Sequence, residues 1–142
     1  MSGGRLHTLR ASKHVMEKTE ILVIDDERSV ADALQVILES EGFGVTLAAT
    51  GREGVERARQ GKFRLAITDL RLPDMSGLEV LQTLQAEHSG LCVILITSYG
   101  TPEILAEARG CGAAGTLDKP FSPSEIVRLI TSVLDPAPNV RS

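Results

Sequence analysis

Long apolar runs are missing from this 142-residue sequence, and none approaches the ~20 residues that a membrane-spanning helix needs. The first twenty residues mix basic and polar side chains without an apolar stretch, so we expect no secretory signal, and a cytoplasmic protein without membrane contact. An excess of positive charge is missing as well, because the formal net charge is -4. We therefore expect no direct binding of nucleic acid by this chain.

Cysteine and histidine are scarce. The two cysteines, Cys92 and Cys111, have neither the spacing of a metal site nor that of a redox motif, and we interpret both as small packing residues. The three histidines, His7, His14 and His88, lie in the N-terminal segment and near a predicted loop. We expect no metal-binding or catalytic role for any of them.

The composition is that of one ordinary globular domain. Hydrophobic residues make up 42% of the chain and charged residues 24%, which excludes a chain that is disordered throughout. We predict a flexible N-terminal extension over residues 1–19 and a single domain over residues 20–134. Residues 135–142 contain two prolines and are interpreted as a tail or the start of a linker.

Short apolar runs alternate with amphipathic segments along the predicted domain. Runs without polar alternation indicate strands that are covered on both faces, as in a parallel sheet. Five strands are predicted over residues 21–24, 45–49, 65–69, 91–96 and 113–118. Helices are predicted over 29–40 and 51–60, from Leu78 to before Ser89, from Thr101 to about Gly110, and from Ser122 to Leu134. Short connections and right-handed crossovers then predict an α/β fold, a three-layer, doubly wound (βα)5 parallel sheet.

Polar side chains follow four of the predicted strands. Asp25 and Asp26 follow the first, Asp69 ends the third, Thr97 the fourth and Lys119 the fifth. Because the carboxyl ends of parallel strands share one edge of the sheet, these side chains are expected to converge there. Two carboxylates about 4 Å apart repel by roughly 4 kcal/mol at an effective dielectric near 20, so the cluster requires a proton or a cation. Oxygen ligands at a solvent-facing site favour Mg²⁺.

A carboxylate left free beside a bound cation can act as a nucleophile toward phosphorus and form an acyl phosphate. Asp69 is the candidate, because it is the isolated acid on the middle strand. The ammonium group of Lys119 and the metal would neutralise phosphoryl oxygens, and the Thr97 hydroxyl would hydrogen-bond the new group. Each residue taken singly has an ordinary structural explanation, such as a cap or a turn, but four strand ends together favour a site.

This pattern is similar to the receiver domain of two-component response regulators. The resemblance covers about Glu20 to Leu134 and rests on several short motifs. They are Asp25-Asp26, Asp69 followed by Pro73 and Gly77, Thr97-Ser98, and Lys119-Pro120-Phe121. The resemblance implies a flavodoxin-like sheet of strand order 2-1-3-4-5. It also implies a phosphorelay domain that takes a phosphoryl group from a histidine kinase or histidine phosphotransfer protein. Such a domain catalyses only its own phosphorylation and dephosphorylation.

The resemblance further implies the ligands of Mg²⁺. They would be Asp26, Asp69 and the backbone carbonyl of Arg71, with Asp25 acting through a water molecule. Lys119 and Thr97 would contact the phosphoryl group on Asp69 and relay its presence.

The sequence departs from the family at Thr116. Receiver domains usually place Tyr or Phe three residues before the lysine that corresponds to Lys119, and that aromatic ring moves inward on activation. The only tyrosine, Tyr99, lies two residues after Thr97. We hypothesise that the switch works through the loop from Thr97 to Thr101 without the usual rotation. Positions corresponding to Arg71 and Tyr99 tune loss of the phosphoryl group in the family, and here both side chains are large enough to shield it.

Two alternatives remain. A small Mg²⁺-dependent aspartyl-phosphate phosphatase usually needs a second acid two residues after its nucleophile, where this sequence has Arg71. A receiver-like interaction module without phosphorylation would not need the acidic pair, Thr97 and Lys119 together. For output we expect protein contacts, and a possible homodimer, through the helix from Thr101, the strand 113–118 and the helix from Ser122.

Overall fold

The computed structural model describes residues 18–135. The predicted N-terminal extension lies almost wholly outside these residues, as do His7, His14 and most of the predicted C-terminal tail. Within the described part, none of the helices has the length and apolar character needed to cross a membrane.

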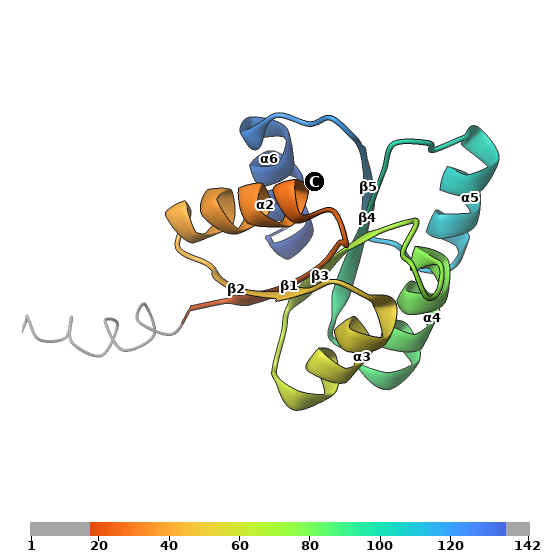
Figure 1. Ribbon diagram of the computed structural model, residues 1–142, viewed down its shortest axis with the longest axis horizontal. Helices are drawn as coiled ribbons and strands as arrows, with labels where there is room; N and C mark the ends of the chain where they lie inside the picture. Colours follow the sequence, from red (N-terminus) through yellow and green to blue (C-terminus); the bar gives the residue numbers. More distant parts are fainter. Residues whose placement is uncertain (1–17, 136–142) are drawn as a thin grey trace, which may run out of the picture.

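Five parallel strands form a single sheet at the centre of the molecule (Figure 1). They are β1 (Glu20–Ile24), β2 (Gly44–Ala48), β3 (Leu65–Asp69), β4 (Cys92–Thr97) and β5 (Gly115–Asp118). Their order across the sheet is β2-β1-β3-β4-β5, which confirms the predicted doubly wound fold and its strand order.

Five helices alternate with the strands and form the outer layers. They are α2 (Arg28–Ser40), α3 (Gly51–Gln60), α4 (Gly77–Glu87), α5 (Pro102–Gly110) and α6 (Pro123–Leu134). In Figure 1, α2 and α6 cover one face of the sheet, and α3, α4 and α5 cover the other. The sheet therefore has a hydrophobic core on each face, as the unbroken apolar strands require.

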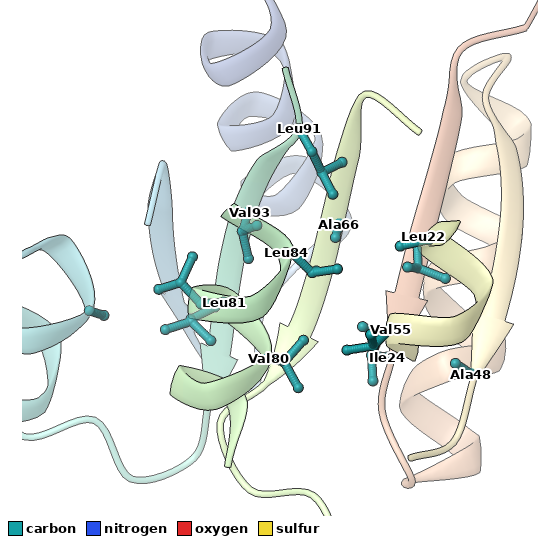
Figure 2. Packing of buried hydrophobic residues seen from close by; sticks show 13 residues of the cluster. Leu22, Ile24, Ala48, Val55, Ala66, Val80, Leu81, Leu84, Leu91 and Val93 are labelled. Carbon is teal, nitrogen blue, oxygen red and sulfur yellow. The ribbon is translucent and has the colours of Figure 1, made fainter. Parts of the chain in front are cut away.

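Each face has its own cluster of buried side chains. On the face of α3 and α4, Val55 and Leu81 pack toward Leu22 and Val93 of the sheet (Figure 2). The opposite cluster joins the β-branched and leucine side chains of the strands to the inner faces of α2 and α6. Its fully buried members include Ile21, Ile67, Ile94, Leu34, Leu38, Ile126 and Ile130.

Some strand boundaries differ from prediction by one or two residues. At these positions the backbone N–H donates to an acceptor in a neighbouring turn or helix. Ala49 was predicted to end the second strand, but its N–H donates to the side chain of Glu53 in α3. Leu91 donates to the carbonyl of His88 and belongs to the turn after α4, so β4 begins one residue later. Ala113 donates to the carbonyl of Ala108 and closes the end of α5.

Side-chain caps set the starts of three helices. Ser76 and Ser122 each form a capping box with a glutamate three residues on, and Thr101 accepts from the N–H of Ile104. Because these caps satisfy the free N–H groups of the first turn, the helices begin immediately after the loops of the sheet edge.

Candidate functional site

Four strand ends meet at the carboxyl edge of the sheet, as predicted. Asp25 follows β1, Asp69 ends β3, Thr97 ends β4 and Lys119 follows β5. The strand register aligns them, because Asp69 pairs with Ile96, the residue before Thr97. Asp25, Asp69 and Thr97 are buried. The sheet therefore gathers side chains that are distant in sequence into one small volume.

Lys119 lies at the centre of this group. Its Nζ donates to Asp69 Oδ2 at 3.0 Å and to Glu27 Oε1 at 2.9 Å. Asp25 Oδ2 is 3.1 Å from the same nitrogen, a close ion-pair contact. The Lys119 side chain is only 9% exposed. A buried ammonium is therefore held by three carboxylates, which offset its loss of hydration.

Burial and these contacts shift the pKa values of Asp25 and Lys119. Burial of the Asp25 carboxyl raises its pKa, hydrogen bonding by Glu27 N–H and contact with Lys119 oppose the rise, and the charge of Asp69 adds to it. Burial disfavours the Lys119 ammonium, but its hydrogen bonds to Glu27 and Asp69 and its close ion-pair contact with Asp25 outweigh burial and raise its pKa. Lys119 is thus a permanent cation at this site.

Asp25 also carries a polar atom that the protein leaves incompletely satisfied. Its Oδ1 accepts from the N–H of Glu27 at 2.9 Å, whereas its buried Oδ2 has no hydrogen bond from any described residue despite the ion-pair contact with Lys119. Oxygen atoms of Asp25, Glu27 and Asp69 lie within 4.8 Å of one another. Carboxylate oxygens so close together, one of them without a donor, fit the binding of a hard divalent cation.

Two neighbouring acids behave differently from expectation. Asp26 is exposed, and its carboxylate is not among the clustered oxygen atoms, so its role as a metal ligand stays a prediction. Glu27, which the sequence pattern did not single out, lies close to Asp25 and Asp69 and contacts Lys119. The available signal was the run of three acids, Asp25-Asp26-Glu27, directly after a buried strand.

The backbone after Asp69 is shaped to present its carboxylate. The N–H of Arg71 donates to Asp69 Oδ1 at 3.2 Å, and the N–H of Gly77 donates to the carbonyl of Leu70 at 2.7 Å. At Gly77, a Cβ atom would collide with the carbonyl oxygen of Asp69. Glycine is needed at this position because the first turn of α4 lies directly against the end of β3.

A second residue missed from the sequence is Asp74, in the loop between β3 and α4. Its two carboxylate oxygens accept from the N–H groups of Gly51 and Arg52, each at 2.8 Å. These bonds, from Arg52 first and then Gly51, lower the pKa of Asp74. The loop that follows Asp69 is therefore tied to the N-terminus of α3.

Side chains that follow β3 and β4 contact one another beside this cluster. The Thr97 hydroxyl oxygen accepts from the N–H of Tyr99 at 3.0 Å. The guanidinium of Arg71 lies over the Tyr99 ring, 4.8 Å from its centroid. Thr116 pairs with Leu95 in the β-ladder and is half-buried.

A pocket of about 270 Å³ opens beside this cluster. Acidic, basic and hydroxyl groups together form its wall, which suits an anion held near a cation. The lining residues are Glu27, Asp69, Arg71, Thr97, Ser98, Tyr99 and Lys119.

Residues 21–131 match the family described as the response regulator receiver domain. The chain belongs to this family. A solved receiver domain (CheY-like) from Methanospirillum hungatei JF-1 superposes with a TM-score of 0.81 at 34% identity, covering 84% of this chain and 95% of that one. A response regulator from Burkholderia pseudomallei, solved with a phosphorylated aspartic acid, a calcium ion and citrate, superposes with a TM-score of 0.76 at 28% identity, covering 82% of this chain and 69% of that one.

Among curated proteins, this receiver domain is 38% identical over 119 residues to the uncharacterized transcriptional regulatory protein YkoG of Bacillus subtilis (strain 168). The match covers 84% of the receiver domain chain and 52% of YkoG. The chain thus spans about half the length of the curated relatives that it matches.

A receiver domain is a signalling module of two-component systems, rather than a conventional enzyme, and family membership implies a kinase partner. The acidic cluster of Asp25, Glu27 and Asp69 is typical of the metal site in such domains. The fold, the cluster and Lys119 agree with the phosphoacceptor chemistry of the family.

Proposed function

We propose that Asp69 accepts a phosphoryl group from a histidine kinase or a histidine phosphotransfer protein. The observation that carries this proposal is the position of the Asp69 carboxylate, at the end of β3, 3.0 Å from Lys119 and at the wall of the pocket. A carboxylate oxygen attacks phosphorus, the O–P bond forms as the bond from phosphorus to the donor nitrogen breaks, and the nitrogen keeps the electron pair. The product is an acyl phosphate.

We propose Mg²⁺ as the cation of the site. Asp26, Asp69 and the backbone carbonyl of Arg71 would be its ligands, and Asp25 would act through a water molecule. The clustered carboxylates and the unbonded Oδ2 of Asp25 support a cation here. When bound, Mg²⁺ would reduce the repulsion between the carboxylates and the incoming phosphoryl oxygens.

Lys119 and Thr97 would both report the phosphoryl group. A hydrogen bond from the Thr97 hydroxyl to a charged phosphoryl is worth roughly 1.5 to 3 kcal/mol. Changing the ratio of active to inactive conformations from 1:99 to 99:1 requires about 5.5 kcal/mol of differential stabilisation. Thr97 alone is therefore insufficient, and Lys119 has to favour the active state as well.

The loop from Thr97 to Thr101 would carry the conformational signal, because Thr116 occupies the usual place of the switch aromatic. In the resting state, the Thr97 hydroxyl oxygen accepts from the backbone of Tyr99. If the Thr97 hydroxyl turned to a phosphoryl group, this bond would weaken and Tyr99 would shift with the loop. A phosphorylated sample in which the signals of Tyr99 stayed unchanged would contradict this route.

The output is proposed to be protein contact in the cytoplasm, with α5, β5 and α6 as the contact surface and a possible homodimer interface. The name of YkoG describes a transcriptional regulatory protein, so a separate or attached DNA-binding partner would be consistent with the same signalling role.

Intact-mass measurement after incubation with acetyl phosphate and Mg²⁺ tests the proposal. We expect the wild-type chain to gain the mass of one phosphoryl group and Asp69→Asn to gain none. Asp32→Asn, which changes an exposed aspartate of α2, serves as the matched control and should gain the same mass as wild type. A wild-type chain that gains no mass, or an Asp69→Asn chain that gains as much as wild type, would refute the assignment.

A further inference from the structure

Glu27 occupies a helix N-cap but does not cap the helix. It precedes the first residue of α2, and its side chain makes no capping hydrogen bond. Its Oε1 instead accepts from Lys119 Nζ at 2.9 Å, across 92 residues of sequence. An N-cap side chain usually satisfies the free N–H groups of the first turn, so this contact takes the side chain away from its common structural role.

The three carboxylates around Lys119 differ in how easily they can leave. The side chains of Asp25 and Asp69 are 0% and 11% exposed, whereas that of Glu27 is 58% exposed. Moving a half-exposed carboxylate into water costs little, because exposed ion pairs contribute little stability. Glu27 is therefore the partner that Lys119 can exchange most readily.

Glu27 also lies between two cavities. With Ser98 and Lys119 it lines both the pocket at Asp69 and an adjoining cavity of about 490 Å³ between α2 and the start of α6. The wall of the adjoining cavity is mainly apolar. Its apolar lining residues are Val30, Ala33, Ile37, Pro120, Phe121 and Pro123. The Glu27–Lys119 ion pair thus forms part of the boundary between an apolar cavity and the polar pocket.

The Lys119 ammonium has few donors to share among acceptors. An ammonium has three N–H groups. Two of them are donated to Asp69 and Glu27, and the side facing Asp25 is occupied by the ion-pair contact. A phosphoryl oxygen on Asp69 that approaches Nζ therefore competes with these carboxylates for the ammonium.

We propose that Glu27 is a displaceable latch on Lys119. This inference rests on the proposed phosphorylation of Asp69. In the resting state Glu27 holds the ammonium in place and closes the boundary between the two cavities. On transfer from acetyl phosphate, an Asp69 oxygen bonds to phosphorus, the bond from phosphorus to the acetyl oxygen breaks, and acetate leaves with the electron pair. A phosphoryl oxygen then replaces Glu27 on Lys119, and the Glu27 carboxylate moves into solvent.

The affinities for beryllofluoride and for Mg²⁺ distinguish a latch from a metal ligand. Beryllofluoride, a stable mimic of the phosphoryl group on a carboxylate, would be titrated against wild type, Glu27→Gln and Glu27→Ala at saturating Mg²⁺. Mg²⁺ affinity would be measured separately on each protein. Removing the competing carboxylate should tighten beryllofluoride binding by about two- to fivefold, as expected for the loss of one half-exposed ion pair, and leave Mg²⁺ affinity unchanged. Glu41→Gln, which removes an exposed charge at the other end of α2, should alter neither affinity.

The rate of mass gain with acetyl phosphate supplies the second measurement. Glu27→Gln should be phosphorylated faster than wild type by a similar factor. Weakened Mg²⁺ binding in Glu27→Gln would overturn the latch and indicate that Glu27 is a metal ligand. Slower or equal phosphorylation would also overturn it and indicate a structural role at the start of α2. Absence of phosphorylation in wild type would instead overturn the proposed function. The two failures are therefore distinguishable.

Discussion

At the scale of single residues, Gly77 shows how closely the acceptor strand and the next helix approach. A Cβ at this position would lie 2.8 Å from the Cα of Leu70, besides its collision with the Asp69 carbonyl. We predict that Gly77→Ala lowers the free energy of unfolding by about 1–3 kcal/mol, the usual range for overpacking. Chemical denaturation would measure the loss.

The control for this prediction is Gly110→Ala, at the end of α5, where an added Cβ meets nothing within 4 Å. Helix propensity favours alanine over glycine at both positions. If Gly77→Ala were as stable as Gly110→Ala, the close approach would not constrain the loop.

Arg71 and Tyr99 make a second prediction at this scale. Their cation–π contact, 4.8 Å from the guanidinium carbon to the ring centroid, lies at the wall of the pocket beside Asp69. If the pair shields the phosphoryl group from water, Arg71→Ala and Tyr99→Ala should each speed autodephosphorylation about two- to fivefold, in line with an exposed cation–π contact. The rate would be followed by loss of phosphoryl mass after removal of the donor.

Because the two side chains act through one contact, the double variant should lose the phosphoryl group no faster than the quicker single variant. Arg109→Ala, which removes an exposed arginine from α5, is the control and should keep the wild-type rate. Unchanged rates in both single variants would show that neither side chain shields the site.

At the scale of elements, the loop between β3 and α4 supplies acceptors for the free N–H groups at the start of α3. Thr50 accepts from the N–H of Glu53, while Asp74 accepts from the N–H groups of Gly51 and Arg52. The threonine cap is a local contact, three residues along the chain. The contribution of Asp74 depends on the sheet, because strand order brings the loop after β3 beside α3.

We predict that Asp74→Asn lowers the midpoint of thermal unfolding at neutral pH, since an amide has one acceptor oxygen where the carboxylate has two. The bonds from Arg52 and Gly51 lower the folded pKa of Asp74 below its ordinary value of 3.8. The stabilisation is therefore present above 3.8 and is lost as pH falls through the lower folded pKa.

Unfolding curves of wild type and Asp74→Asn at several pH values would measure this dependence. The difference between them should be constant near neutral pH and shrink toward acid. Asp32→Asn, at an exposed i,i+4 ion pair of α2, should show little difference at any pH. A difference that grew toward acid would contradict the proposed cap.

At the scale of the whole molecule, the carboxylate cluster links folding to a cation. A ligand that binds only the folded state stabilises it, by about 2.7 kcal/mol at a concentration 100 times its dissociation constant. We predict that Mg²⁺ raises the unfolding midpoint of wild type and that EDTA reverses the rise. Asp25→Asn should respond much less, because it lacks the carboxylate whose buried Oδ2 has no hydrogen bond from any described residue.

In EDTA the same variant should be more stable than wild type at neutral pH. Burial and the charge of Asp69 raise the folded pKa of Asp25 above its ordinary value of 3.8. The folded state therefore loses stability relative to the unfolded chain as pH rises from that value through the folded pKa. The amide of the Asp25→Asn variant carries no charge and would escape this loss. A variant less stable than wild type in EDTA would contradict the electrostatic argument.

Much of the fold was predictable because local signals agreed with it. Short, largely apolar runs predicted all five strands, and the segments from Thr101 and Ser122 predicted two helices that begin at side-chain caps. Errors in the strands lay at their ends, such as Ala49 and Leu91, where turns and caps compete with the ladder for the same N–H groups.

The sequence by itself determined which chemical groups lie at the sheet edge. Asp25, Asp69 and Lys119 each stand at the end of a predicted strand, and parallel strands place their carboxyl ends together. The tertiary structure alone decided which other acid contacts Lys119. Asp26 and Glu27 are adjacent in sequence, yet only Glu27 is aimed at the ammonium. That choice depends on how the segment between β1 and α2 meets the segment after β5, a contact across 92 residues of sequence that no local pattern encodes.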